Sequence, residues 1–331
     1  MIWSIQYLRF FACIFVVIYH ITKKSSLSTG WGYLDIGAAG VDIFFVISGF
    51  IMVYISNKKE SNGLVFIKNR FSRVYPIYLI TLIPFIIILL VAPHMVNSNQ
   101  APPSIVKSLT LIPFFSGSYV NLVAWTLSFE FYFYIIFAVS LYLTKKVVVA
   151  SSMIISAAFL IGIAFDIKFI KSALVFEFII GMYMHELIYK KKIEATLPIS
   201  ALISLVGFAL LLSTHKMSMN GDGERLFYYG IPSAIIFLGF LLCANSVKKQ
   251  TALAFLGDAS YSIYLTHILS INAIYFLFKK ANGVSEHYWM MITSATLLSM
   301  IVGAFTYKFI EKPIIKLTKS LLVKKTSSAN T

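Results

Sequence analysis

The chain has 331 residues, of which 59% are hydrophobic and only 12% are charged, with a mean hydropathy of +0.83. This composition excludes a soluble globular domain, because a soluble surface needs far more charge, and it excludes a disordered or fibrous chain. The net charge of +15 is typical of the basic cytoplasmic loops of a membrane protein, so we expect no nucleic acid partner.

Ten apolar segments follow one another along the chain, each close to the length of about 20 residues that crosses a bilayer. They lie at 3–22, 38–56, 75–92, 122–143, 147–165, 170–189, 196–213, 226–246, 258–278 and 289–310. A smaller apolar patch at 104–118 is suited to a re-entrant or interfacial position. The sequence therefore predicts an all-α, polytopic transmembrane helical bundle of about ten spans.

The basic residues predict how this bundle is oriented and organised. Both ends of the chain and the loops expected on the same side carry 19 Lys and Arg, whereas the opposite loops carry 9. The positive-inside rule then places both termini in the cytoplasm. We expect a single membrane domain over residues 1–318 and a short basic cytoplasmic tail at 319–331.

The first span contains "RFFACIFVVIYH", with an arginine near one end and a histidine eleven residues later. At about 100° per residue, Arg9 and His20 return to within about 20° of one helix face, about 16 Å apart along the axis. Polar groups in lipid are costly, so this stripe indicates a function. The alternatives are a snorkelling anchor for Arg9 and an interfacial histidine bonded to a backbone carbonyl for His20.

The second span contains "GVDIFFVISGF", which places Asp42 early in the span and Ser48 near its middle. A carboxylate at Asp42 can orient an imidazole of the neighbouring first span and fix its tautomer. The alternative is an interfacial N-cap for the second helix. The glycine after Ser48 permits close contact between helices.

Two further arginines stand in "FIKNRFSRVYP", just before Pro76, which we expect to open the third span. Arg70 and Arg73 are three residues apart and share a helix face. Two guanidiniums at a cytoplasmic membrane entrance suit the bidentate binding of phosphates. The alternative is an anchor to anionic lipid.

Polar side chains recur in the later spans. Glu130, in "WTLSFEFYFY", is predicted to handle protons or to form half of an ion pair, and Glu177 is a weaker instance of the same signal. In "DASYSIYLTH", Ser260, Tyr264 and His267 form a polar stripe at i, i+4 and i+7. His267 is then either a second functional imidazole or a hydrogen-bonded packing residue.

The last span ends in "FIEKP", which places Glu311 at the cytoplasmic edge, where it can pair with an entrance arginine. We expect Pro313 to end that helix. Cys13 and Cys243 lie inside apolar segments, so no disulfide is expected, and the sequence has no metal-ligand spacing, so no metal is expected.

Together these motifs resemble the acyltransferase 3 family of integral membrane O-acyltransferases, which modify bacterial surface polysaccharides and lipopolysaccharide O-antigens. The matching features run in family order from 7 to 313: the arginine–histidine pair, "GVDIFFVISGF", "FIKNRFSRVYPIY", "WTLSFEFYFY", "LGDASYSIYLTH" and the terminal "EKP". Many members have two glycines where "AAGVD" has Ala39 and Gly40. Some members also carry a hydrolase-like domain after the last span, and we expect none here.

The resemblance implies catalysis by His20, as a general base or as a covalent acyl carrier. It also implies acyl-CoA handling by the three arginines of the first and third spans, Arg9, Arg70 and Arg73. Asp42 or Glu130 is the candidate for orienting the imidazole. Further polar lining residues are expected at Ser48, Tyr264, His267 and Glu311.

The implied reaction moves an acyl group, acetyl in the simplest case, from cytoplasmic acyl-CoA to a hydroxyl outside. Acetyl-CoA is the expected cosubstrate, and the acceptor is a glycan or a lipid-linked saccharide. The implied location is the bacterial cytoplasmic (inner) membrane, with lipids as neighbours. Two alternatives stay open: a transporter or flippase for a polysaccharide precursor, and an acyltransferase for a small hydrophobic acceptor such as a macrolide.

Overall fold

A computed structural model of the chain describes residues 2–58, 62–93, 101–217, 221–247, 251–281 and 283–318, so the tail predicted at 319–331 lies outside the described residues. The structure is 79% helical with almost no strand. The first half of the chain forms α1 (Trp3–Thr29), the 3-10 turn η1 (Asp35–Ala38), α2 (Ala39–Lys58), α3 (Gly63–Val91), β1 (Pro103–Ser104), α4 (Ile105–Thr110), β2 (Ser118–Tyr119), α5 (Ala124–Leu143) and α6 (Val147–Ala164).

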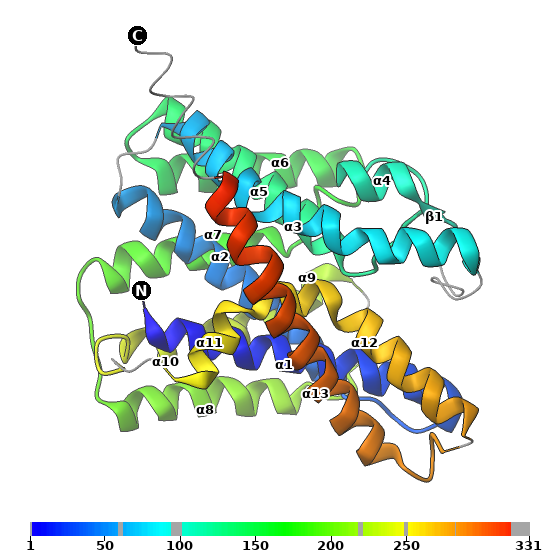
Figure 1. Ribbon diagram of the computed structural model, residues 1–331. Coiled ribbons are helices and arrows are strands. Elements are labelled where there is room, and N and C mark those ends of the chain that lie inside the picture. The colour runs from blue at the N-terminus through cyan, green and yellow to red at the C-terminus, as the bar shows by residue number, and fades with distance from the viewer. Residues whose placement is uncertain are drawn as a thin grey trace.

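The second half is helical as well and includes three π-helical turns, η3, η4 and η5. Its elements are α7 (Val175–Met184), η3 (His185–Tyr189), α8 (Leu197–Ser213), α9 (Asp222–Arg225), η4 (Leu226–Gly230), α10 (Ile231–Leu242), α11 (Ala252–Asp258), α12 (Ser260–Lys280), α13 (Tyr288–Thr306) and η5 (Tyr307–Glu311). The long helices run back and forth, and the N-terminus lies at the end of the bundle where α11 leads into α12 (Figure 1).

Each of the ten predicted apolar segments contains a helix. In the described part of the chain, eight helical segments are long and apolar enough to cross a membrane by length and composition. The segment predicted at 170–189 is helical only from Val175, and α8 has 17 residues. The helical membrane class is therefore confirmed, whereas the number of spans and the sides of the termini stay predictions.

Glycines set the close approach of the second helix to its neighbours. A Cβ at Gly49 would lie 2.1 Å from the carbonyl oxygen of Phe178 on α7, and a Cβ at Gly181 would lie 2.0 Å from that of Val46. A Cβ at Gly40 would lie 2.2 Å from the carbonyl oxygen of Ala12 on α1. The glycines of "GVDIFFVISGF" thus let α2 pack backbone to backbone against α1 and α7.

Two prolines do not act as the sequence predicts. The helix α3 begins at Gly63, where the side chain of Asn62 accepts a hydrogen bond from the Leu64 amide at 2.7 Å, and it continues through Pro76. Likewise the last helix continues past Pro313 to residue 318, after the wide turn η5. Neighbouring helices and π turns let a membrane helix tolerate the missing proline amide, so neither proline marks a helix end.

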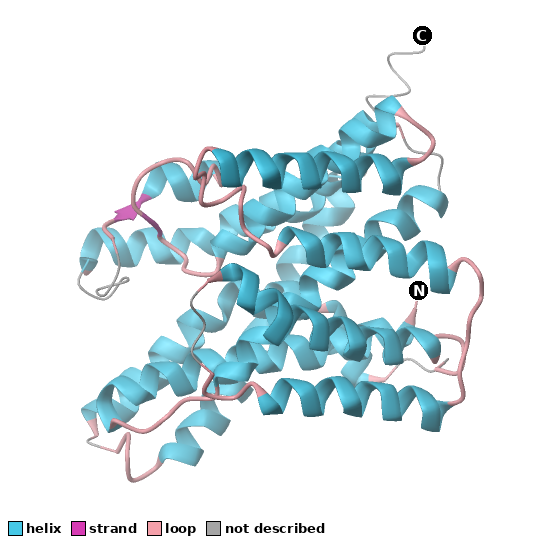
Figure 2. Ribbon diagram, turned by 180° about the vertical axis from the view of Figure 1, so that it is seen from behind, coloured by secondary structure: helices cyan, strands magenta, loops and turns pink. Residues whose placement is uncertain are grey.

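The predicted apolar patch at 104–118 forms β1, α4 and β2, which fold back at one end of the bundle (Figure 2). The hydroxyl of Tyr78 on α3 donates to the carbonyl of Ser108 at 2.6 Å. The hydroxyl of Ser128 on α5 donates to the carbonyl of Leu111 at 2.8 Å. These bonds give partners to the backbone of an irregular segment, as burial requires.

Candidate active site

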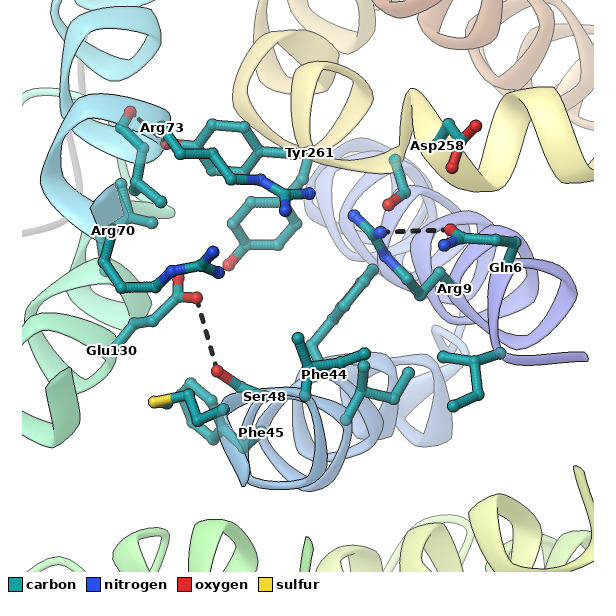
Figure 3. A pocket seen from close by; sticks show the side chains of 18 of the residues that line it. Gln6, Arg9, Phe44, Phe45, Ser48, Arg70, Arg73, Glu130, Asp258 and Tyr261 are labelled. Atoms are coloured by element: carbon teal, nitrogen blue, oxygen red, sulfur yellow. Dashed lines mark hydrogen bonds between the residues drawn. The ribbon is translucent and has the colours of Figure 1, made fainter. Parts of the chain in front are cut away.

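A cavity of about 470 Å³ lies between α1, α2, α3, α5, α12 and η5 (Figure 3), and its lining includes Ile2, Ile5 and Gln6 at the start of the chain. Its volume falls in the range of about 300–1,000 Å³ that is usual for small-molecule sites. Its charged lining residues are Arg9, Arg70, Arg73, Glu130, Asp258, Glu311 and Lys312. The sequence places these residues far apart, and the fold brings them around one space.

Three arginines face this cavity from two sides. Arg70 and Arg73 approach it from α3, and Arg9 approaches it from α1 on the opposite side (Figure 3). Within the described residues none of the three forms a salt bridge, although Arg9 donates a hydrogen bond to Gln6 Oε1 at 3.1 Å. The Nε of Arg70 is buried without a hydrogen-bond partner. Such a group of cations favours an anionic ligand.

The chain has four arginines, and the fourth behaves differently. Arg225, at the end of α9, donates to Asp42 Oδ1 at 3.1 Å and to Oδ2 at 2.8 Å. Asp42 is fully buried, and Glu177 of α7 is fully buried beside the pair. The contrast shows that a buried carboxylate can neutralise an arginine in this fold, whereas none of the three cavity arginines forms such a salt bridge with a described residue.

Arg225 is a residue that sequence reasoning missed. Because Arg225 lies in a polar loop, its charge reads as one more basic residue that sets membrane orientation. The signal that could have found it is Asp42, since a carboxylate in an apolar span needs a cationic partner. The pairing also changes the role expected of Asp42. Among the described residues its side-chain hydrogen bonds come from Arg225, and none joins it to His20.

Glu130 lies in the cavity wall and not beside His20. Its Oε1 accepts hydrogen bonds from the hydroxyl of Tyr134, one turn along α5, and from Ser48 Oγ of α2 at 3.5 Å (Figure 3). The carboxylate therefore faces the space between Ser48 and the arginines of α3. Ser48 and Glu130 thus line one cavity, and His20, which Glu130 was expected to orient, is not among the lining residues.

Glu311 lines the cavity without the expected arginine partner. It is 2% exposed, and its Oε2 accepts a hydrogen bond from Ser262 Oγ of α12 at 2.5 Å. Among the described residues it forms no salt bridge. The structure therefore shows no direct pairing with an entrance arginine, because η5 places the carboxylate against the hydroxyl of Ser262 on α12.

His20 lies farther along α1 and does not line this cavity. Its ring centroid is 4.9 Å from that of Tyr19 and 5.2 Å from that of His267 on α12. His267 in turn lies 5.7 Å from Tyr264, which lines the cavity and shares a 2.9 Å hydrogen bond with Thr126. Successive ring contacts, from Tyr264 to His267 and from His267 to His20, thus connect the arginine cavity with the candidate base.

Comparison with known proteins decides the family. The model of a family described as an acyltransferase domain, acyltransferase 3, matches residues 2–308, which is nearly the whole chain. The chain belongs to the acyltransferase 3 family. The resemblance inferred from the motifs is confirmed, and the structure adds that the motif arginines of this acyltransferase 3 protein surround one cavity.

Three relatives of this acyltransferase 3 protein are informative. The exopolysaccharide production protein ExoZ of Rhizobium meliloti is 30% identical over 91% of this chain and 95% of its own length. The acyltransferase MdmB of Streptomyces mycarofaciens is 24% identical over 95% and 92%. The O-acetyltransferase OatA of Staphylococcus aureus is 24% identical over 93% of this chain but only 56% of its own length. No solved structure matches the chain.

Proposed function

We propose that this acyltransferase is an O-acetyltransferase of a bacterial cytoplasmic (inner) membrane. It would transfer acetyl from cytoplasmic acetyl-CoA to a hydroxyl of a surface glycan, such as an exopolysaccharide, an O-antigen or their lipid-linked precursor. The observation that carries the proposal is the set of three arginines around one cavity, none of which forms a salt bridge with a described residue. His20 is connected to this cavity by ring contacts through His267 and Tyr264. The names of ExoZ and OatA support a polysaccharide acceptor and acetyl transfer.

The arginines fit the donor because coenzyme A carries several phosphates. Guanidiniums bind phosphate oxygens in pairs. The three arginines form no salt bridge with the described residues, although Glu130, Asp258 and Glu311 also line the cavity, so their N–H groups stay available to phosphate. Arg9 stands in the first turns of α1, and Arg70 and Arg73 stand in the first half of α3. The positive-inside bias predicts that this end faces the cytoplasm, where acyl-CoA is made available.

In the proposed reaction His20 acts as the general base. The acceptor O–H bond breaks and the proton moves to a ring nitrogen of His20, while the oxygen forms a bond to the thioester carbonyl carbon. The C–S bond then breaks with its electron pair on sulfur, and His20 returns the proton so that coenzyme A leaves as a thiol. A covalent route would instead form an acyl-imidazole on His20, and rapid quenching with radiolabelled acetyl-CoA and no acceptor would reveal the labelled protein.

The test compares surface glycan from wild-type cells, a deletion strain and complemented strains by mass spectrometry and proton NMR. We expect the deletion strain to lose an acetyl signal that the wild-type gene restores and His20→Ala does not. His287→Ala is the matched control, because His287 is exposed at the start of α13. An acetyl pattern unchanged by the deletion, with the glycan present, would exclude this acceptor class. A loss of glycan export with normal acetyl content per chain would instead favour the transporter.

A further inference from the structure

His20 and His267 face each other across the contact between α1 and α12. Their ring centroids are 5.2 Å apart, with the planes inclined by 48°. In the described part of the chain His20 makes no hydrogen bond, while Asp42 is held by Arg225 and Glu130 by Tyr134. A base that must take up a proton still needs a group that fixes its orientation and tautomer. His267 is the imidazole that another helix brings to that position.

The hydrogen bond of His267 defines which of its nitrogens is free. Its Nδ1 lies 2.7 Å from the carbonyl oxygen of Tyr264, and because a carbonyl only accepts, Nδ1 carries the hydrogen. The side chain is fully buried and forms no ion pair with the described residues, so the neutral ring is favoured. Nε2 then holds a lone pair, and it has no hydrogen-bond partner among the described residues.

The surroundings hold this imidazole in place. The side-chain amide of Asn121, fully buried before α5, donates to the carbonyl of Leu265 at 3.1 Å. The thiol of Cys13 on α1 lies 3.5 Å from the carbonyl of Ser260 at the start of α12. These contacts tie the part of α12 before His267 to α1 and to the segment before α5. The ring itself is held by the bond from Nδ1 to Tyr264, so the free Nε2 is a constrained acceptor and not a freely turning one.

We infer that His267 is the positioning residue of His20, an inference that rests on the proposed function. Nε2 of His267 accepts the N–H of His20, which leaves the other nitrogen of His20 free to take the proton of the acceptor hydroxyl. His267 itself neither gains nor loses a proton. It stabilises the imidazolium that His20 becomes, as a carboxylate does in a catalytic triad. The two rings are not hydrogen-bonded to each other here, and such bonds often tighten only when substrate binds.

The test uses two variants of His267 that place a hydrogen-bond acceptor at different positions. In His267→Gln the amide oxygen reaches the position of Nε2, whereas in His267→Asn it reaches only the position of Nδ1. The full-length protein is reconstituted in lipid nanodiscs with acetyl-CoA as donor, and deletion-strain polysaccharide serves as the acceptor. We expect His267→Asn to lower kcat by about 10- to 100-fold with the KM for acetyl-CoA within about twofold. His267→Gln is expected to recover most of that loss.

The outcomes separate this inference from the function on which it rests. A wild-type protein that transfers no acetyl, or a His20→Ala variant that still does, overturns the proposed function and the inference with it. If the wild type transfers acetyl and His20→Ala does not, a normal kcat in His267→Asn overturns the inference alone. An equal loss of kcat in His267→Gln and His267→Asn also overturns the inference, because a packing role does not distinguish the two amides. A loss expressed in KM and not in kcat overturns it as well.

Discussion

Arg225 donates two hydrogen bonds to the carboxylate of Asp42, at 3.1 and 2.8 Å, and thereby joins α9 to the first turn of α2. Asp42 is fully buried, and Arg225 also lies over the rings of Trp125 and Tyr229, at 5.9 and 5.7 Å. The pair therefore belongs to the packed interior of the bundle, where a single unpaired charge is far more costly than in water.

Breaking this pair is expected to destabilise the protein strongly. Asp42→Ala removes the carboxylate that forms the salt bridge with Arg225, leaving only the Glu177 carboxyl beside the guanidinium, and should cost up to about 3–5 kcal/mol of unfolding free energy. Thermal unfolding of the detergent-solubilised protein, followed by intrinsic fluorescence, measures the loss as a fall in Tm. The double variant Asp42→Leu with Arg225→Met should lose less than the sum of the two single changes, because it removes both charges together.

The matched control for that prediction is a pair on the surface. Lys171 donates a hydrogen bond to Asp166, whose side chain is 78% exposed, in the segment between α6 and α7. Because solvent screens this pair, Asp166→Asn should leave Tm almost unchanged, and asparagine also tolerates the left-handed backbone at this position, φ 52°. Equal effects of Asp42→Ala and Asp166→Asn would contradict the claim that the Asp42–Arg225 pair is a buried structural contact.

The arginine cavity predicts which donor groups are recognised. Arg73→Ala should raise the KM for acetyl-CoA about tenfold or more and leave kcat within about twofold. The reason is that the lost charged hydrogen bond holds acetyl-CoA equally in the ground state and in the transition state. Lys308→Ala is the control, since Lys308 is exposed on η5 and does not line the cavity. If the alanine variants of Arg9, Arg70 and Arg73 all keep the wild-type KM for acetyl-CoA, this cavity does not bind the phosphates of the donor.

A donor that lacks the 3′-phosphate of coenzyme A can show which arginine binds that phosphate. The wild type should bind 3′-dephospho-acetyl-CoA more weakly than acetyl-CoA. For the arginine that holds the 3′-phosphate, substitution by alanine should add no further loss with the shortened donor, because the contact is already absent. Competition assays with both donors against the single variants Arg9→Ala, Arg70→Ala and Arg73→Ala provide the measurement. Equal additional losses for all three would mean that none of them contacts that phosphate.

Membrane orientation can be tested with single cysteines. Both native cysteines, Cys13 and Cys243, are buried, which keeps background labelling low. Gly32→Cys lies in the segment after α1, and Lys145→Cys lies between α5 and α6, and both positions are exposed. We expect a membrane-impermeant maleimide to label Gly32→Cys in intact cells and Lys145→Cys only after permeabilisation. The reverse pattern would place the N-terminus and the arginine cavity outside.

Close packing of α2 on α7 predicts a steric effect of one methyl group. Gly49→Ala should lower Tm by the equivalent of about 1–3 kcal/mol, because the new Cβ would meet the carbonyl oxygen of Phe178 at 2.1 Å. Gly32→Ala is the neutral control, since nothing lies within 4 Å of its added Cβ. A Gly49→Ala protein as stable as the control would show that the two helices can separate without loss.

The sequence by itself determined the membrane class, the existence of the helices and the family. Those features depend on the length of apolar runs and on local motifs such as "NRFSR", so each can be recognised within one segment. The same local reasoning placed Arg70 and Arg73 on one helix face, and the structure places both at one cavity. It failed at Pro76 and Pro313, because tolerance of a missing amide depends on the surrounding helices.

Only the tertiary structure decided which polar residues meet. The sequence offers Asp42, Glu130 and Glu311 as equal candidates to face His20 or an arginine, since all three are carboxylates in apolar spans. In the folded chain Asp42 accepts hydrogen bonds from Arg225, Glu130 accepts one from Ser48, and Glu311 accepts one from Ser262. His267 is the residue that packs beside His20. Each of these contacts joins residues at least 49 positions apart. Helical periodicity fixes the face of a side chain but not the neighbouring helix that it meets.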